Sequence, residues 1–177
     1  MNSIPTRVFL DTSVVNFILT YGEQIHENVD APIGLPIRVL RDIEALRGIW
    51  NTGQRANWEI IISQYTVHEL ECTKDKNRRS SLLSWAGEII GYQGGAVNSG
   101  SCERFAPITI QEIVSILPDS PDRRLVHDAI EAGCDAFCTR DWKTMLSLRH
   151  KLQLLPIKIV APHEWWELIE PFAALYI

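Results

Sequence analysis

Short runs of largely apolar residues alternate along the chain with longer segments in which apolar positions recur every three or four residues. The short runs predict buried strands. The longer segments have the spacing of helices with one apolar face. The expected strands are 7–10, 59–63, 136–139 and 157–160, and the expected helices are 14–19, 35–53, 66–70, 77–92, 109–116, 122–132, 142–152 and a last one around Trp165 and Trp166.

The order of these elements predicts the fold class. Strands that alternate with helices form a parallel sheet with helices on both of its faces. We therefore expect an α/β protein with a three-layer α/β/α arrangement. The length of 177 residues predicts a single domain that spans residues 1–177. Residues 21–36 and 93–107 are rich in Gly, Pro or Ser and predict loops.

Composition narrows the class of protein. Apolar residues make up 46% and charged residues 22% of the chain, as in ordinary globular proteins. The net charge of −5 argues against a surface that is basic throughout. No secretory signal and no membrane span are visible, so a cytoplasmic location is expected. Cys134 and Cys138 lie at a helix-to-strand junction, where small buried core residues are expected rather than metal ligands.

Four acidic residues stand where strands end or helices begin. Asp11 closes the first strand, and Glu69 lies in the first turn of the helix after the second strand. Asp141 follows the third strand, and Asp122 opens the helix that leads into that strand. Ligands of open parallel sheets bind beyond the carboxyl ends of the strands, so these four side chains are expected to meet there.

Such a cluster of carboxylates predicts a metal site. Mg²⁺ and Mn²⁺ are hard cations that prefer oxygen ligands. Without a cation, neighbouring carboxylates repel one another or take up protons. The structural alternative is that each acid only caps a helix. Thr66 and Glu69 have the spacing of a capping box, Asp11 and Asp141 suit N-cap positions, and Asp122 follows Pro121 in a first turn.

Three further aspartates lie near these positions. Asp128 is six residues beyond Asp122 and is expected to face outward from the helix. Asp135 opens a strand rather than ending it, so it is excluded from the site. Asp119 lies just before Asp122, and the sequence leaves open whether it joins the site.

At these residues the chain resembles the PIN domain family of nucleases. Val8-Phe9-Leu10-Asp11-Thr12-Ser13 is similar to the opening strand and first acid of the family. Ser63 and Glu69, six residues apart, resemble its second motif. The stretch from Asp122 to Thr139-Arg140-Asp141 resembles its helix, strand and closing threonine–acid pair, and is the most specific part of the match.

The resemblance implies a parallel sheet of four to five strands, a Mg²⁺ or Mn²⁺ cofactor and hydrolysis of single-stranded RNA. It carries over Asp11, Glu69, Asp122 and Asp141 as catalytic and metal-binding residues, with Ser13 and Thr139 as supporting groups. Many small members are toxins held inactive by an antitoxin, and homodimers are common among them. The chain is longer than those toxins, with extra residues expected at 21–36 and 75–107.

The expected activity is that of a metal-dependent endoribonuclease, with a toxin-type role, an antitoxin partner and a homodimer as further expectations. Arg140, Lys143 and Arg123 flank the acids and are candidates for contacts to RNA phosphates. Two alternatives stay open. One is a metal-dependent nuclease that acts on DNA, and the other is a catalytically silent PIN-like binding module. The sequence does not determine the RNA target, the number of metals or the oligomeric state.

Overall fold

The fold was analysed in a computed structural model that describes residues 4–53, 55–56, 58–92, 96–97 and 108–174. Its central sheet is parallel and has five strands in the order β3-β2-β1-β4-β5. The strands are β1 (Arg7–Leu10), β2 (Glu59–Ser63), β3 (Ala96–Val97), β4 (Ala136–Cys138) and β5 (Lys158–Val160). The helices are α1 (Thr12–Thr20), α2 (Gly22–His26), α3 (Ile37–Gly53), α4 (Gln64–Glu71), α5 (Lys76–Tyr92), α6 (Ile108–Val114), α7 (Ser120–Glu131), α8 (Met145–Leu148) and α9 (Pro162–Ala173), with a 3-10 turn, η1 (Arg149–Lys151), after α8.

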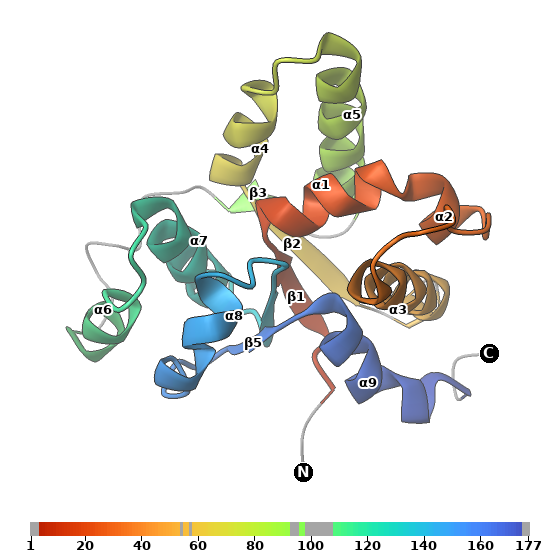
Figure 1. The fold of residues 1–177 in the computed structure, drawn as a ribbon. Coiled ribbons are helices and arrows are strands. Elements are labelled where there is room, and N and C mark those ends of the chain that lie inside the picture. Colours follow the sequence, from red (N-terminus) through yellow and green to blue (C-terminus); the bar gives the residue numbers. More distant parts are fainter. Residues whose placement is uncertain (1–3, 54, 57, 93–95, 98–107, 175–177) are drawn as a thin grey trace.

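Alternate residues of β1, β2, β4 and β5 enter two separate cores, which confirms the three-layer α/β/α prediction. Val8 and Leu10 of β1 point to one face, where α1, α2, α3, α5 and α9 pack. Phe9 of β1 points to the other face, where it stacks on Phe137 of β4 and where α6, α7 and α8 pack. Figure 1 shows these two groups of helices on either side of the strands.

Helices α3 and α9 pack against each other closely. An added Cβ atom at Gly48 of α3 would lie 2.7 Å from the ring of Trp166, so only glycine fits there without a shift. Trp165 of α9 is almost fully buried. The same contact brings Asp42 of α3 within 2.9 Å of His163 of α9.

Some predicted boundaries were wrong. The expected loop at 21–36 contains α2, which buries Ile25 in the core, and the expected loop at 93–107 contains β3. Helix α7 begins at Ser120, because Pro121 fits the first turn of a helix rather than ending one. The helix expected at 142–152 is reduced to α8 and η1. The Asp141 side chain accepts hydrogen bonds from two following backbone N–H groups, which forms a turn before α8.

The cysteines that the structure describes behave as expected. Cys134 and Cys138 are buried and free, which confirms them as small core residues. Burial raises the pKa of the Cys134 thiol to about 12. Cys102 lies outside the described residues. Within the described part of the chain, no helix has the length and apolar character needed to cross a membrane.

Candidate metal site at the carboxyl end of the sheet

Asp11 lies at the centre of the carboxyl end of the sheet, directly after β1. Its side chain is only 8% exposed. Its Oδ2 atom accepts a hydrogen bond from the hydroxyl of Ser13 and another, of 2.7 Å, from the hydroxyl of Thr139. The sequence had named both hydroxyls as supporting groups, and the structure brings them onto the same carboxylate oxygen.

The surroundings of Asp11 disfavour the charged form of its carboxylate. Burial raises its pKa, and the neighbouring Asp141 raises it further. The hydrogen bonds from Ser13, Thr139 and the Thr12 backbone act in the opposite direction and do not outweigh burial. A cation beside Asp11 would therefore stabilise its charged form strongly.

Asp141 joins Asp11 through Thr139. The hydroxyl of Thr139, which is fully buried, donates to Asp11 and accepts a hydrogen bond of 3.0 Å from the backbone N–H of Asp141. The Oδ1 atom of Asp141 accepts from the backbone N–H groups of Lys143 and Thr144. The turn from β4 to α8 thus fixes the Asp141 carboxylate close enough to Asp11 to affect its pKa.

Asp122 reaches the same place from the first turn of α7. Its pKa is raised to about 6, first by partial burial and then by the charges of Asp11, Asp141 and Asp119. A hydrogen bond with the Thr144 side chain lowers it in part. Asp119 is exposed at the N-cap of α7 and acts on Asp122 from the rim of the site. The structure therefore gathers Asp11, Asp122 and Asp141 into one electrostatic group.

Glu69 is connected to this group through Thr12. The Thr12 hydroxyl lies 2.6 Å from Glu69 Oε2, and Thr12 follows Asp11 directly in the chain. The Thr66 hydroxyl is 3.4 Å from that of Thr12, which brings α4 against the start of α1. Glu69 is thus linked by a hydrogen bond to Thr12, the residue that follows Asp11. The sequence analysis did not single out Thr12 or Thr144, and their only signal was proximity in sequence to an acid.

The capping alternative accounts for the four acids only in part. Asp122 lies in the first turn of α7, as that alternative requires, whereas Asp141 accepts the backbone hydrogen bonds of a turn and the N-cap of α8 is Thr144. Asp11 occupies the N-cap position of α1, but its side chain makes no capping hydrogen bond to that helix. The predicted capping box of Thr66 and Glu69 is wrong, because α4 begins earlier, at Gln64, and is capped by Ser63. The Glu69 carboxylate instead accepts from Thr12.

Three other aspartates, Asp42, Asp128 and Asp135, lie outside this group of carboxylates. Asp128 was predicted to face outward, but it is 1% exposed, because α7 lies with that side against the protein. Asp135 stays excluded, since its carboxylate accepts hydrogen bonds from Thr6 and Arg7 at the amino end of the sheet. Asp42 of α3, which the sequence analysis did not single out, is fully buried. Its position between Val39 and Leu46 at helical spacing was the signal that could have revealed it.

The three candidate RNA contacts have different settings. Lys143 is exposed beside Asp141. Arg123 is half-buried and donates a hydrogen bond of 2.8 Å to the carbonyl of Pro118. Arg140 donates from Nε to the buried carboxylate of Asp42 at 2.8 Å, a structural contact that the sequence analysis did not anticipate. Of the three, Lys143 is thus the cation whose side chain is most available to a ligand.

The donor chemistry fits Mg²⁺ or Mn²⁺, while the side-chain positions do not form a closed ligand set. The donors are carboxylate oxygens from β1, α7 and the turn after β4, the kind of ligand that both cations prefer. Over the ranges that the structure describes, no group of three or more His, Cys, Asp or Glu side chains is arranged so that it could hold a metal ion. Asp122 and Asp141 are both partly exposed.

The chain matches no protein-family model, no curated protein and no solved structure. The geometry and chemistry of the residues therefore carry the functional argument.

Proposed function

We propose that this protein is a PIN-like endoribonuclease that hydrolyses single-stranded RNA with the help of Mg²⁺ or Mn²⁺. One observation carries the proposal. The carboxylates of Asp11, Asp122 and Asp141 come from three separate elements at the carboxyl end of the sheet, and burial first, then the charges of neighbouring carboxylates, raises the pKa of Asp11 and Asp122. Among the residues that the structure describes, none of the three forms an ion pair with Lys, Arg or His. Such uncompensated charge is the arrangement expected where a cation is to bind.

In this proposal Asp11, Asp122 and Asp141 hold the cation, and Ser13 and Thr139 fix the Asp11 carboxylate toward it. When bound, the ion lowers the pKa of an attacking water and offsets charge on the phosphate. Glu69 orients that water and accepts its proton, and Thr12 sets the place of the Glu69 carboxylate. Lys143 contacts a neighbouring phosphate. The expected products carry a 5′-phosphate and a 3′-hydroxyl.

The test is cleavage of a labelled single-stranded RNA by the purified protein, with Mg²⁺, Mn²⁺ or EDTA. A DNA strand of the same sequence is assayed in parallel, and the ends of the products are identified. Asp11→Asn removes the charge of the central carboxylate and is expected to lower cleavage by more than about 100-fold, beyond the loss usual for outer partners of a metal ligand. Asp135→Asn is the matched control, because it makes the same change at the other end of the sheet.

Each outcome separates the candidates. Metal-dependent RNA cleavage that Asp11→Asn abolishes and Asp135→Asn retains supports the proposal. Cleavage of the DNA strand alone would make the protein a nuclease for DNA. A 2′,3′-cyclic phosphate on the products would rule out the proposed route.

A catalytically silent PIN-like module is the second candidate. The lack of a closed group of metal ligands among the described residues favours it. A folded protein that neither cleaves RNA or DNA nor binds Mn²⁺ would establish that alternative.

A toxin-type role, an antitoxin partner and a homodimer remain extensions of the proposal that rest on the family resemblance. If the protein is such a toxin, its induced expression stops growth of a bacterial host, and Asp11→Asn removes that effect. Light scattering of the purified protein tests the homodimer separately.

A further inference from the structure

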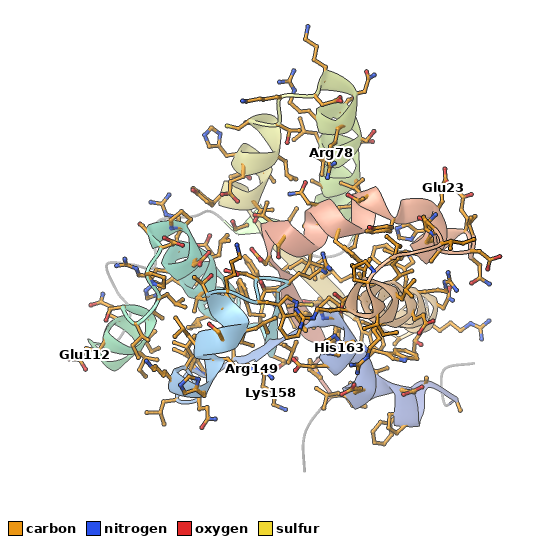
Figure 2. The ribbon with its side chains drawn as sticks, viewed as in Figure 1. Glu23, Arg78, Glu112, Arg149, Lys158 and His163 are labelled. Carbon is orange, nitrogen blue, oxygen red and sulfur yellow. The ribbon has the colours of Figure 1, made fainter. Side chains whose placement is uncertain are left out.

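Asp42 of α3 is a buried acid that lies behind the turn carrying Asp141. Its side chain is 0% exposed, and both of its oxygens have partners. Oδ2 accepts a hydrogen bond of 2.8 Å from Nε of Arg140, and Oδ1 lies 2.9 Å from Nδ1 of His163. His163 stands at the start of α9, where that helix meets α3 (Figure 2). Asp42 therefore connects α3, α9 and the turn after β4.

Arg140 also contacts α1. The centre of its guanidinium lies 3.6 Å from the centre of the Phe17 ring, and its side chain is 20% exposed. The backbone N–H of Arg140 donates a hydrogen bond of 3.0 Å to the hydroxyl of Ser13. Ser13 and Phe17 are one helical turn apart on α1, so the backbone and the side chain of Arg140 contact the same face of that helix.

Arg140 is next to both groups that orient Asp11, because it follows Thr139 in the chain and donates a hydrogen bond to Ser13. Arg140 stands directly between Thr139, which donates to Asp11, and Asp141, whose backbone N–H donates to Thr139. Ser13, which accepts from Arg140, donates in turn to Asp11. A shift of Arg140 would move both hydroxyl donors to Asp11, as well as the Asp141 carboxylate.

We propose that Asp42 is a positioning residue for the candidate metal site. Through Arg140 it holds residues 139–141 against α1 and so sets the places of the Asp11 and Asp141 carboxylates. A buried ion pair is weak grounds for expecting a gain in stability, since apolar residues of similar volume often serve as well. The directional fork of arginine suits it to fix a turn in one orientation. The inference rests on the proposed function for the nature of the ligand, which is a divalent cation.

The first test is the affinity for Mn²⁺, measured by calorimetry on the full chain. Arg140→Lys keeps the positive charge beside Asp42 and the backbone N–H to Ser13, but loses the planar fork over Phe17. Asp42→Asn removes the charge that holds Arg140. We expect each folded variant to bind Mn²⁺ about 10- to 100-fold more weakly, the usual loss when an outer partner of a metal ligand is changed.

The matched control is Arg41→Ala. Arg41 neighbours Asp42 on α3 and forms an exposed ion pair of 3.0 Å with Glu167 of α9, so its loss disturbs the same helix pair without touching the turn. Its affinity for Mn²⁺ should equal that of the unchanged protein. If Asp42→Asn fails to fold, Arg140→Lys decides the matter, because it preserves the charge balance of the buried pair.

A second readout does not depend on metal. Amide hydrogen exchange of Arg140 and Asp141 reports the hydrogen bonds to Ser13 and Thr139 directly. We expect exchange at both amides to be at least about tenfold faster in Arg140→Lys than in Arg41→Ala, in EDTA. If the unchanged protein binds no Mn²⁺ but this difference is found, the positioning role stands and the metal-dependent function falls.

Unchanged affinity and unchanged amide exchange would contradict the positioning role. If the unchanged protein binds Mn²⁺ and both folded variants bind it with the same affinity and show unchanged amide exchange, the positioning role is overturned. The proposed function would then be unaffected.

Discussion

At the two ends of the sheet, the pKa of an aspartate is shifted in opposite directions. At the carboxyl end, Asp11 is buried, and burial together with the nearby carboxylate of Asp141 raises its pKa. At the amino end, burial acts on Asp135 in the same direction, but hydrogen bonds from Thr6 and Arg7 outweigh it and lower its pKa. Asp135 also lies near the guanidinium of Arg7, whereas the neighbours of Asp11 include Asp141.

The difference separates a structural acid from a candidate functional one. Asp135 closes the start of β1, and its charge is satisfied within the chain. Asp11 receives hydroxyl donors but no ion pair with a basic side chain among the described residues. Nearly equal sequence environments, an aspartate at one end of a strand, thus yield opposite electrostatics. The predictions below test this contrast, from the largest expected effect to the smallest.

The largest effect is expected from the arginines at the two ends. Arg140→Ala leaves the fully buried Asp42 with the imidazole of His163 but without its guanidinium partner, which should lower the free energy of unfolding by about 3 kcal/mol. Arg7→Ala removes an exposed pair with Glu59 and a hydrogen bond to the Ala132 carbonyl, and should cost about 1–2 kcal/mol. Urea unfolding measures both. Equal losses would show that burial of the partner does not distinguish the two ends.

Mn²⁺ should stabilise the folded protein only through the carboxyl end of the sheet. Mn²⁺ at 100 times its dissociation constant should stabilise the folded protein by about 2.7 kcal/mol. Asp11→Asn should abolish that gain, because the central carboxylate is lost, while Asp135→Asn should retain it. Thermal unfolding with Mn²⁺ and with EDTA gives the comparison. A gain that survives in Asp11→Asn would place the cation elsewhere.

Removal of the two charges should change stability in opposite directions. Asp135→Ala removes the acceptor for Thr6 and Arg7 and should cost about 1 kcal/mol. Asp11→Asn removes a buried charge and should raise the melting temperature at pH 8 in EDTA. A fall in the melting temperature of Asp11→Asn would mean that its hydrogen bonds outweigh the cost of burying its charge.

The smallest effect is the dependence of stability on pH in EDTA. The pKa of Asp122 is about 6 in the folded protein and 3.8 in an ordinary setting. Between these values the folded state binds more protons than the unfolded state, so stability should fall as pH rises from about 4 to about 6. Asp122→Asn should flatten this decline. The effect is modest because Asp122 is half-exposed, and a decline of the same slope in the variant would assign it to another group.

Asp135 contributes the opposite sign. Its pKa is lowered in the folded protein, so its contribution to stability is present above its ordinary value and is lost as pH falls through the folded one. Asp135→Asn should therefore reduce the loss of stability in acid and leave the decline between pH 4 and pH 6 unchanged. Melting curves from about pH 2 to about pH 7 compare the two variants directly.

Local pattern was sufficient for most of the fold. The apolar runs at β1, β2, β4 and β5 are short and nearly uninterrupted, and their alternation with helices leaves few arrangements other than a parallel sheet covered on both faces. Strand β3 was not predicted, since its two residues carry too little pattern to read. The helix expected at 142–152 failed for a different reason, because the Asp141 side chain forms a turn with the backbone that follows.

The sequence by itself determined which acids stand at strand ends, because chain order and strand direction place the residues after β1 and β4 at one end of the sheet. It also placed Ser13 and Thr139 beside them. Only the tertiary structure decided that Glu69 meets Thr12, that Asp128 is buried and that Asp42 holds Arg140. Those facts depend on how helices rotate and pack against one another, and contacts between residues as far apart as Asp42 and Arg140 leave no trace in local periodicity.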